Sequence, residues 1–141
     1  MPTLIELTAE ECERLLRRGT FGRMVLSTPH RNEIVPVNYA VHETTVVVHT
    51  SRDGLLARHA DGAQLVFEVD FVDDERWQGW SVVARGRGRV STDLRAVPPV
   101  RPWADGDRSC EIQLRWDELT GRKLGAGWDA EEAMYSRKAV R

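Results

Sequence analysis

Hydrophobic and polar residues alternate with a period of two along most of the chain, a pattern that predicts β-strands. Six segments carry it, at residues 22–28, 33–41, 46–50, 63–71, 79–91 and 109–116. Most connections between them are too short for the crossovers of a parallel sheet, and the first three segments are expected to form an antiparallel meander. Closing the sheet would also remove its exposed edges. The pattern therefore predicts a mainly β fold, a six-stranded antiparallel barrel with a few helices.

Helical signals interrupt the alternation. "TAEE" at residues 8–11 is a capping box of Thr8 and Glu11, which predicts an N-terminal helix within residues 1–20 that ends at Gly19. A short helix is expected within residues 51–62, with Asp53 as its N-cap, and a C-terminal helix over residues 129–140. One helical turn is expected over 92–97. No linker or repeat divides the pattern, so residues 1–141 are expected to form a single domain.

The segment 33–41 contains two residues that strands disfavour, Pro36 and Asn38. Alternation places them together on one face of the strand, and the opposite face is apolar, formed by Val35, Val37, Tyr39 and Val41. Two interpretations stay open. The polar face borders a ligand groove, or the strand lies at an edge of the sheet, where a proline is tolerated.

Three arginines, Arg85, Arg87 and Arg89, share one face of the segment 79–91, and Trp80 lies on the other. A row of this kind fits an anion-binding or nucleic-acid-binding stripe. However, Glu68 and Asp70 lie on the strand that is expected to pair beside it. Cross-strand ion pairs would account for the arginines without a ligand, so we favour a solvated ladder of charges.

Composition narrows the classes of function. The 141 residues are 41% hydrophobic and 30% charged, with a net charge of −2 and a pI near 6.1. A near-neutral balance does not favour nucleic-acid binding, and the acidic N-terminal segment is neither a signal peptide nor a membrane span. We therefore expect a cytoplasmic protein. Cys12 and Cys110 lack metal-ligand or redox spacing and are interpreted as free thiols, and no metal site or nucleophile motif emerges.

One junction brings phosphate-binding groups together. "HTSRDG" runs from a strand into the short helix, where the hydroxyls of Thr50 and Ser51, the guanidinium of Arg52 and free helix amides converge. The alternative is that Asp53 caps the helix with its carboxylate and repels an anion. The local sequence does not decide between the two.

The order of motifs resembles a known family. "GRMVLST", "VPVNYAV", "VVVHTS", "LVFEVD", "GWSVVARGRGRV", "RPW" and "LTGRKL", which span roughly residues 8–124, are similar to the pyridoxamine 5′-phosphate oxidase-like family in its small actinobacterial-type branch. The resemblance implies a flavin-binding split barrel that forms a homodimer and holds FMN at the subunit interface. It also implies an oxidoreductase that acts on a small-molecule substrate, with no essential protein nucleophile or base.

Carried onto this chain, the family pattern indicates the residues that would meet the cofactor. The residues at the matching strand positions and at the late basic position are Pro36, Val37, Asn38, Tyr39, His49, Thr50, Ser51, Arg52, Trp80, Ser81 and Arg122.

The chain departs from the family after the third predicted strand. Where members carry a hydroxyl residue and a lysine for the FMN phosphate, this chain has Leu55 and Leu56. Losing charge-assisted bonds to the phosphate would weaken FMN binding. The departure motivates an alternative, a split-barrel protein that binds deazaflavin, haem or another flat ligand, or nothing, without turnover.

Overall fold

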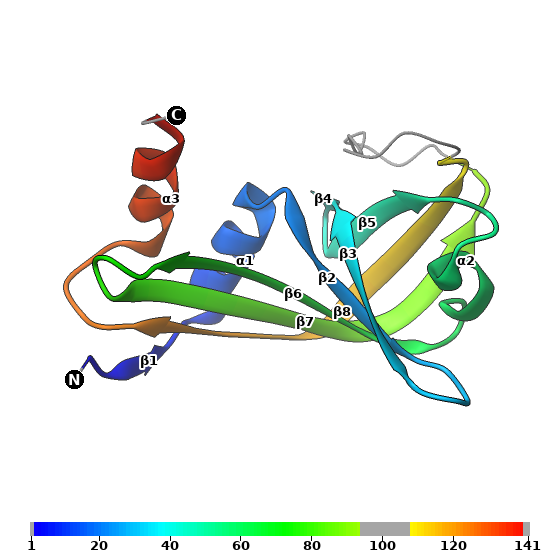
Figure 1. Cartoon of the computed structure of the whole chain (residues 1–141), viewed down its shortest axis with the longest axis horizontal. Helices are drawn as coiled ribbons and strands as arrows, with labels where there is room; N and C mark the ends of the chain where they lie inside the picture. The colour runs from blue at the N-terminus through cyan, green and yellow to red at the C-terminus, as the bar shows by residue number, and fades with distance from the viewer. Residues whose placement is uncertain (1, 94–107, 140–141) are drawn as a thin grey trace.

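The computed structural model describes residues 2–93 and 108–139, with side chains described as far as residue 134 (Figure 1). The elements in chain order are β1 (Leu4–Glu6), α1 (Ala9–Arg18), β2 (Phe21–Ser27), β3 (Asn32–Asn38), β4 (Ala40–His42), β5 (Thr45–Thr50), α2 (Leu55–His59), β6 (Gln64–Asp73), β7 (Gln78–Ser91), β8 (Cys110–Leu124) and α3 (Ala130–Ala139). The "RPW" motif and most of the helical turn predicted over 92–97 lie outside the described residues.

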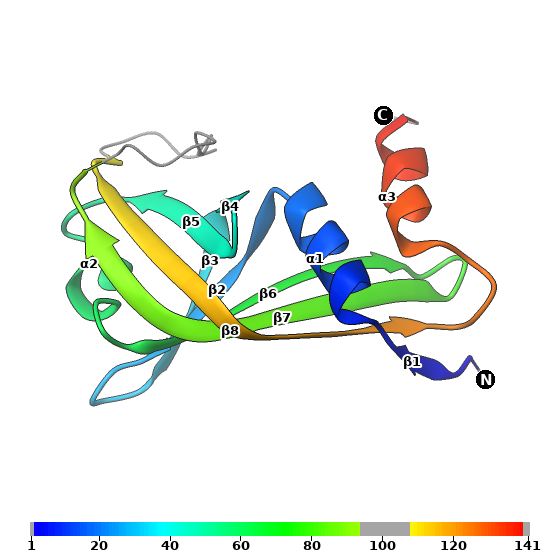
Figure 2. The same ribbon diagram turned by 180° about the vertical axis from the view of Figure 1, so that it is seen from behind.

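The strands form a curled antiparallel sheet with the order β3-β2-β6-β7-β8-β5-β4, and β1 pairs with β8 beside this path (Figures 1 and 2). This confirms the mainly β split-barrel prediction, although the described residues form eight strands where six were predicted. The predicted meander of the first three strands is confirmed, because the segment predicted as one strand over 33–41 pairs antiparallel with β2 through β3 and with β5 through β4. The further partners, β6 for β2 and β8 for β5, were not predicted, since alternation shows which face of a strand is buried but not which distant strand lies next to it.

The barrel closes where the predicted strand 33–41 changes partners. Its first part, β3, pairs with β2, and its second part, β4, pairs with β5 at the other end of the strand order. Tyr39 lies between the two parts. Since β3 is the last strand on its side of the sheet, Pro36 sits in an edge strand, where the missing amide hydrogen costs no ladder bond.

Two strands differ in extent from the prediction. β8 continues to Leu124 instead of ending near residue 116, and β1 was not predicted. Arg85 pairs with Glu118 whereas Gly86 pairs with Trp116, so Asp117 is an extra residue in a β-bulge. The bulge breaks the period of two, which explains why the second half of β8 was missed.

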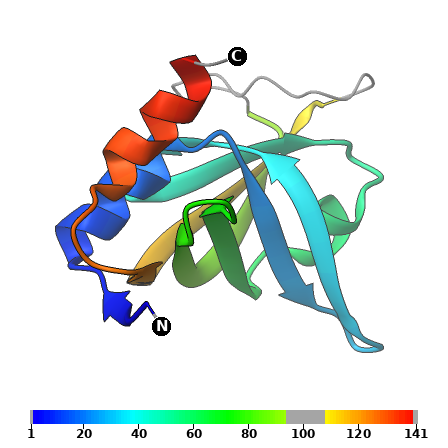
Figure 3. The same ribbon diagram turned by 60° about the vertical axis from the view of Figure 1, so that its left-hand side comes forward.

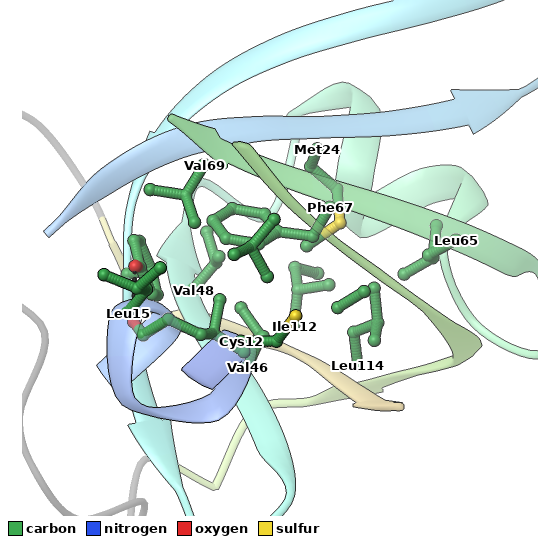
Figure 4. Packing of buried hydrophobic residues seen from close by; sticks show 14 of the residues in the cluster. Cys12, Leu15, Met24, Val46, Val48, Leu65, Phe67, Val69, Ile112 and Leu114 are labelled. Atoms are coloured by element: carbon green, nitrogen blue, oxygen red, sulfur yellow. Dashed lines mark hydrogen bonds between the residues drawn. The ribbon is translucent and has the colours of Figure 1, made fainter. Parts of the chain in front are cut away.

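Helix α1 supplies one side of the core. The capping box is confirmed, since the Thr8 hydroxyl accepts from the Glu11 amide and the Glu11 carboxylate accepts from the Thr8 amide. Its buried side chains, Cys12 and Leu15 among them, point toward strand residues such as Val46 and Phe67 (Figure 4). Both cysteines are free, as predicted, and both are buried.

Helix α3 lies beside α1 (Figure 3). Arg18 of α1 donates to Glu131 of α3 at 2.9 Å, and the Lys123 ammonium donates to the Trp128 carbonyl at 2.7 Å in the turn that leads to α3. No helix in the described ranges combines the length and hydropathy of a membrane span.

A charged cluster lies on the outer face of β2 and β6. The Arg23 guanidinium is 2.9 Å from a Glu68 carboxylate oxygen and 3.5 Å from an Asp70 oxygen. Burial, the hydrogen bond with Asp70 and the negative charge of Asp70 raise the pKa of Glu68 to about 7, although Arg23 opposes the shift. The ladder predicted between these carboxylates and Arg85, Arg87 and Arg89 is therefore wrong, because the carboxylates face Arg23.

We predict that Tyr39→Phe lowers the free energy of unfolding by about 1 to 3 kcal/mol. The hydroxyl of the buried Tyr39 donates to the Leu16 carbonyl oxygen at 2.6 Å, so its loss leaves a buried acceptor without a partner. Urea unfolding followed by circular dichroism measures the change. An unchanged midpoint would show that this bond does not hold the crossing between β3 and β4.

We also predict that the free energy of unfolding falls as pH rises from about 5 to 7, partly through Glu68. Its pKa of about 7 in the folded protein exceeds the ordinary value of 4.5, so over this range the folded state holds a proton that the unfolded chain has released. Glu68→Gln should flatten the decline, as measured by urea unfolding at several pH values. Glu75→Gln, in the exposed β6–β7 turn, is the control and should keep it. Equal slopes for the two variants would contradict the assignment.

Candidate functional site

The predicted site residues fall into three groups on the barrel. His49, Thr50, Ser51 and Arg52 lie at and just after the end of β5. Trp80, Ser81 and Arg122 lie on β7 and β8 near β1. The third group, Pro36 to Tyr39, ends β3 and reaches the crossing to β4.

The first two groups are far apart in one chain. His49 pairs with Glu111 and Ser81 pairs with Arg122, so the groups lie eleven positions apart along β8. At about 3.3 Å per residue this is up to roughly 36 Å along the strand. Figure 1 shows the same separation, with the β5 end near α2 and the other group near β1 at the opposite end of the molecule. One chain therefore does not bring all the predicted residues around one small ligand.

The second group borders a pocket of about 340 Å³ on the outer face of the sheet. Its walls come from β1, β7 and β8 and are formed by Leu4, Glu6, Ser81, Val83, Arg85, Thr120, Gly121 and Arg122. Two guanidinium groups, two hydroxyl groups and one carboxylate thus meet in one hollow. Ser81 and Arg122 were predicted to contact the cofactor, whereas Arg85 was interpreted as part of a solvated ladder of charges.

The strand β1, which forms one wall of this pocket, was missed from the sequence. The signal was present but short, since in "IEL" at residues 5–7 one acidic residue lies between two apolar residues, directly before the capping box. Leu4 is 54% exposed and Glu6 pairs with Arg122 in register. A three-residue strand without a turn on either side gives periodicity too little length to detect.

Trp80 does not face the pocket. Alternation puts its side chain on the inner face with Val82 and Ala84, and it is 3% exposed. Its indole Nε1 is buried and has no hydrogen-bond partner among the described residues. Of the predicted pair "WS", only Ser81 presents its side chain to the outer face.

The first group is built around a buried carboxylate that sequence reasoning missed. Glu111 is fully buried on the face of β8 opposite to Ile112, and its two oxygens contact His49 Nε2 at 3.1 Å and Gln113 Nε2 at 2.6 Å. The contact with Glu111 therefore fixes the orientation of the His49 side chain. Arg52 donates from Nε to the Ser109 hydroxyl at 2.9 Å. A charged residue between two core residues, in "CEI", was the available signal.

The predicted cap of α2 is wrong. The helix begins after Gly54 without a side-chain cap, and Asp53 lies outside it, with its amide donating to the Ser51 hydroxyl at 3.3 Å. Because α2 has only five residues, its helix dipole attracts an anion only weakly. Leu56 is 1% exposed in the core and Leu55 packs against the core, so these positions offer no polar side chain to a phosphate.

The third group is divided between two faces of the barrel. The Tyr39 side chain lies in the core, edge-on to Phe67 with ring centres 4.6 Å apart, and burial raises its pKa. Val37 also packs against the core. Pro36 is exposed and Asn38 half-buried, and Asn38 Nδ2 donates to the Thr20 carbonyl at 3.4 Å. These two residues are the part of the group on the outer face.

The outer residues of β3 share a row with the pocket. Pro36 pairs with Arg23, Arg23 with Glu68, Glu68 with Val83, and Val83 with Thr120. Since neighbouring strands lie about 4.8 Å apart, this row carries one continuous surface from the edge strand to the pocket.

Comparison with known proteins places the chain in a family. A model of the pyridoxamine 5′-phosphate oxidase family matches residues 8–123. A curated relative, the uncharacterized protein Rv0080 of Mycobacterium tuberculosis, is 27% identical over 132 residues, which are 87% of each chain.

Two solved structures from Mycobacterium smegmatis have the same fold. Its FAD binding protein is 27% identical, with a TM-score of 0.68 over 86% of this chain and 98% of that one. Its FAD and heme binding protein is 17% identical, with a TM-score of 0.66 over 93% of this chain and 79% of that one, a likeness of fold alone. By its sequence match across residues 8–123, this chain belongs to the pyridoxamine 5′-phosphate oxidase family.

Proposed function

We propose that the protein is a flavin-dependent oxidoreductase that binds its flavin between two copies of the chain. The observation that carries this proposal is the separation of the site residues along β8, with His49 paired at one end and Ser81 at the other. In a two-fold dimer the same surface is used by both chains, so one end of one chain can meet the other end of its partner. Two equivalent sites would form in this way.

The outer face offers a surface that a second copy could cover. Ile34 is 67% exposed, and it pairs in register with Val25, which pairs with Val66. This apolar row lies next to the row that links Pro36 to Thr120. Apolar side chains gathered on one exposed face are typical of association surfaces.

The residues present fit the chemistry of a flavin nucleotide. Hydroxyl groups of Ser81 and Thr120 and the guanidinium of Arg122 are donors, and a flavin has carbonyl and phosphate oxygens that accept. When bound, the flavin supplies the redox chemistry. The chain's own part is to orient it, with His49 fixed by Glu111 at one end of the site and Arg122 at the other.

The choice of nucleotide follows from α2. Leu55 and Leu56 leave no polar side chain where the family pattern has phosphate ligands, and Leu56 is needed in the core. FAD has a second phosphate and an adenosine, which offer further contacts. Although the sequence resemblance points to FMN, we expect FAD to bind at least as tightly. The FAD binding protein that is 27% identical supports this expectation.

A second candidate is a binding protein without turnover that holds deazaflavin or haem on the same barrel. Its specific support is the leucine pair of α2, together with the haem named for one protein of the same fold. It differs from the first candidate in which ligand binds and in whether an added reductant is oxidised.

We predict that the purified chain binds flavin and shows the visible absorption of oxidised flavin. Titration with FMN, FAD, deazaflavin and haem, followed by quenching of flavin fluorescence or by haem absorption, measures each affinity. Reduction of the bound flavin by NADH or NADPH would support an oxidoreductase. Tight binding of haem or deazaflavin with no binding of either flavin would favour the second candidate instead.

We also predict that two variants that each bind flavin weakly complement each other when they are mixed. One carries Thr50→Val with Ser51→Ala and the other carries Arg122→Gln, so each damages one end of the shared site and should bind flavin weakly. In a mixed dimer one site receives both damaged ends and the other receives neither, so equal mixing should restore about a quarter of the tight sites. Flavin titration after unfolding and refolding the mixture measures this fraction. A site contained in one chain would give no recovery.

A further inference from the structure

The family pattern gives the pocket residue Arg85 no role, and its sequence context favoured a solvated ladder of charges over an anion-binding stripe. Arg85 is half-buried on β7, four positions after Ser81, and lines the same hollow as Ser81, Thr120 and Arg122. The carboxylates that were expected to pair with it, those of Glu68 and Asp70, instead lie 2.9 and 3.5 Å from the Arg23 guanidinium. Its surroundings therefore differ from those of a solvated charge ladder.

Within the part of the chain that the structure describes, neither guanidinium of the pocket forms an ion pair with an acid. Glu118 stands opposite Arg85 and Glu6 stands opposite Arg122 in the strand register, yet no ion pair within 4.0 Å joins either couple among residues 2–93 and 108–134. With Glu6 as the one acid in its walls, the pocket has two positive charges against one negative charge. Two hydroxyl groups, of Ser81 and Thr120, add neutral donors.

We propose that Arg85 and Arg122 form an anion subsite that binds a phosphate or carboxylate group of the molecule held in the flavin site. Guanidinium groups bind such groups through paired, charge-assisted hydrogen bonds, and the hollow brings two of them together with two hydroxyl groups. Arg85 is thus a binding residue, and the ligands that this pocket accepts are anionic. The inference rests on the proposed function for the identity of that ligand, but not for the charge of the pocket.

The anion has two possible sources, the flavin's own phosphate or an acidic group of the substrate. Riboflavin, which lacks a phosphate, separates them when compared with FMN. Inorganic pyrophosphate, titrated into the protein with and without flavin, probes the subsite without an organic ligand. Low ionic strength keeps the attraction measurable.

The experiment compares Arg85→Gln with Arg87→Gln in the full chain. Arg87 is two positions along the same face of β7, lies outside the pocket and donates to the Gly62 carbonyl at 2.8 Å, so both variants lose one positive charge from one strand. Arg85→Lys, which keeps the charge but not the paired donors, is included in case the glutamine variant is poorly folded. Thermal unfolding checks all three.

If the subsite holds the flavin phosphate, Arg85→Gln should raise the dissociation constant of FMN roughly 10- to 100-fold and leave that of riboflavin unchanged. If the subsite holds an acidic group of the substrate, Arg85→Gln should bind FMN and riboflavin as the wild type does. Pyrophosphate should then bind the flavin-loaded variant at least roughly 10-fold more weakly than the flavin-loaded wild type. Either result, with Arg87→Gln close to wild type, supports the subsite.

The same measurements distinguish a failure of the anion subsite from a failure of the proposed flavin-dependent function. If the wild-type chain binds no flavin but binds pyrophosphate, and Arg85→Gln alone weakens that binding, the subsite stands and the proposed function fails. If Arg85→Gln and Arg87→Gln behave alike toward FMN, riboflavin and pyrophosphate, or if the wild-type chain binds pyrophosphate no better than Arg85→Gln, the subsite is overturned.

Discussion

The barrel depends on a single stretch of backbone, residues 32–42, that pairs with β2 over its first part and with β5 over its second. Tyr39 stands at the change of partner, and its hydroxyl donates to the Leu16 carbonyl in α1. Gly19, which ends α1, has no room for a Cβ, since that atom would lie 2.1 Å from the Tyr39 hydroxyl oxygen. The end of the helix, the crossing and the core are therefore one packed unit, and the two halves of the sheet are held closed by it.

Closure decides where chemistry can take place. The inner positions of β7 are occupied by core residues such as Trp80 and Val82, and Gly88 is tight because a Cβ there would lie 2.3 Å from the Ala60 carbonyl oxygen. With the interior filled, polar groups such as Ser81 and His49 can serve a ligand only from the outer face. The long β7–β8 ribbon then holds them at opposite ends. A filled barrel with a divided site is the physical reason to look for a second chain.

Local patterns in the sequence predicted the elements better than their neighbours. The capping box of Thr8 and Glu11 and the alternation in β6 and β7 act within a few residues, and the structure confirms them. The pairings of β2 with β6 and of β5 with β8, the ion pair of Arg23 with Glu68 and the buried bond from His49 to Glu111 join residues far apart in the chain. No local period encodes them. The family resemblance supplied the fold, but it grouped residues that one chain keeps apart.

The three arginines of β7 show why position in a pattern does not decide a role. Alternation gives Arg85 and Arg87 the same face, yet the bulge at Asp117 lies between their partners on β8, with Arg85 opposite Glu118 and Gly86 opposite Trp116. An extra residue bends a strand and increases its twist, so side chains on its two sides are aimed differently. Arg87 turns to the Gly62 carbonyl beside α2, whereas Arg85 turns to the pocket beside β1. The irregularity that hid half of β8 from the sequence pattern is also the feature that separates a binding arginine from a structural one.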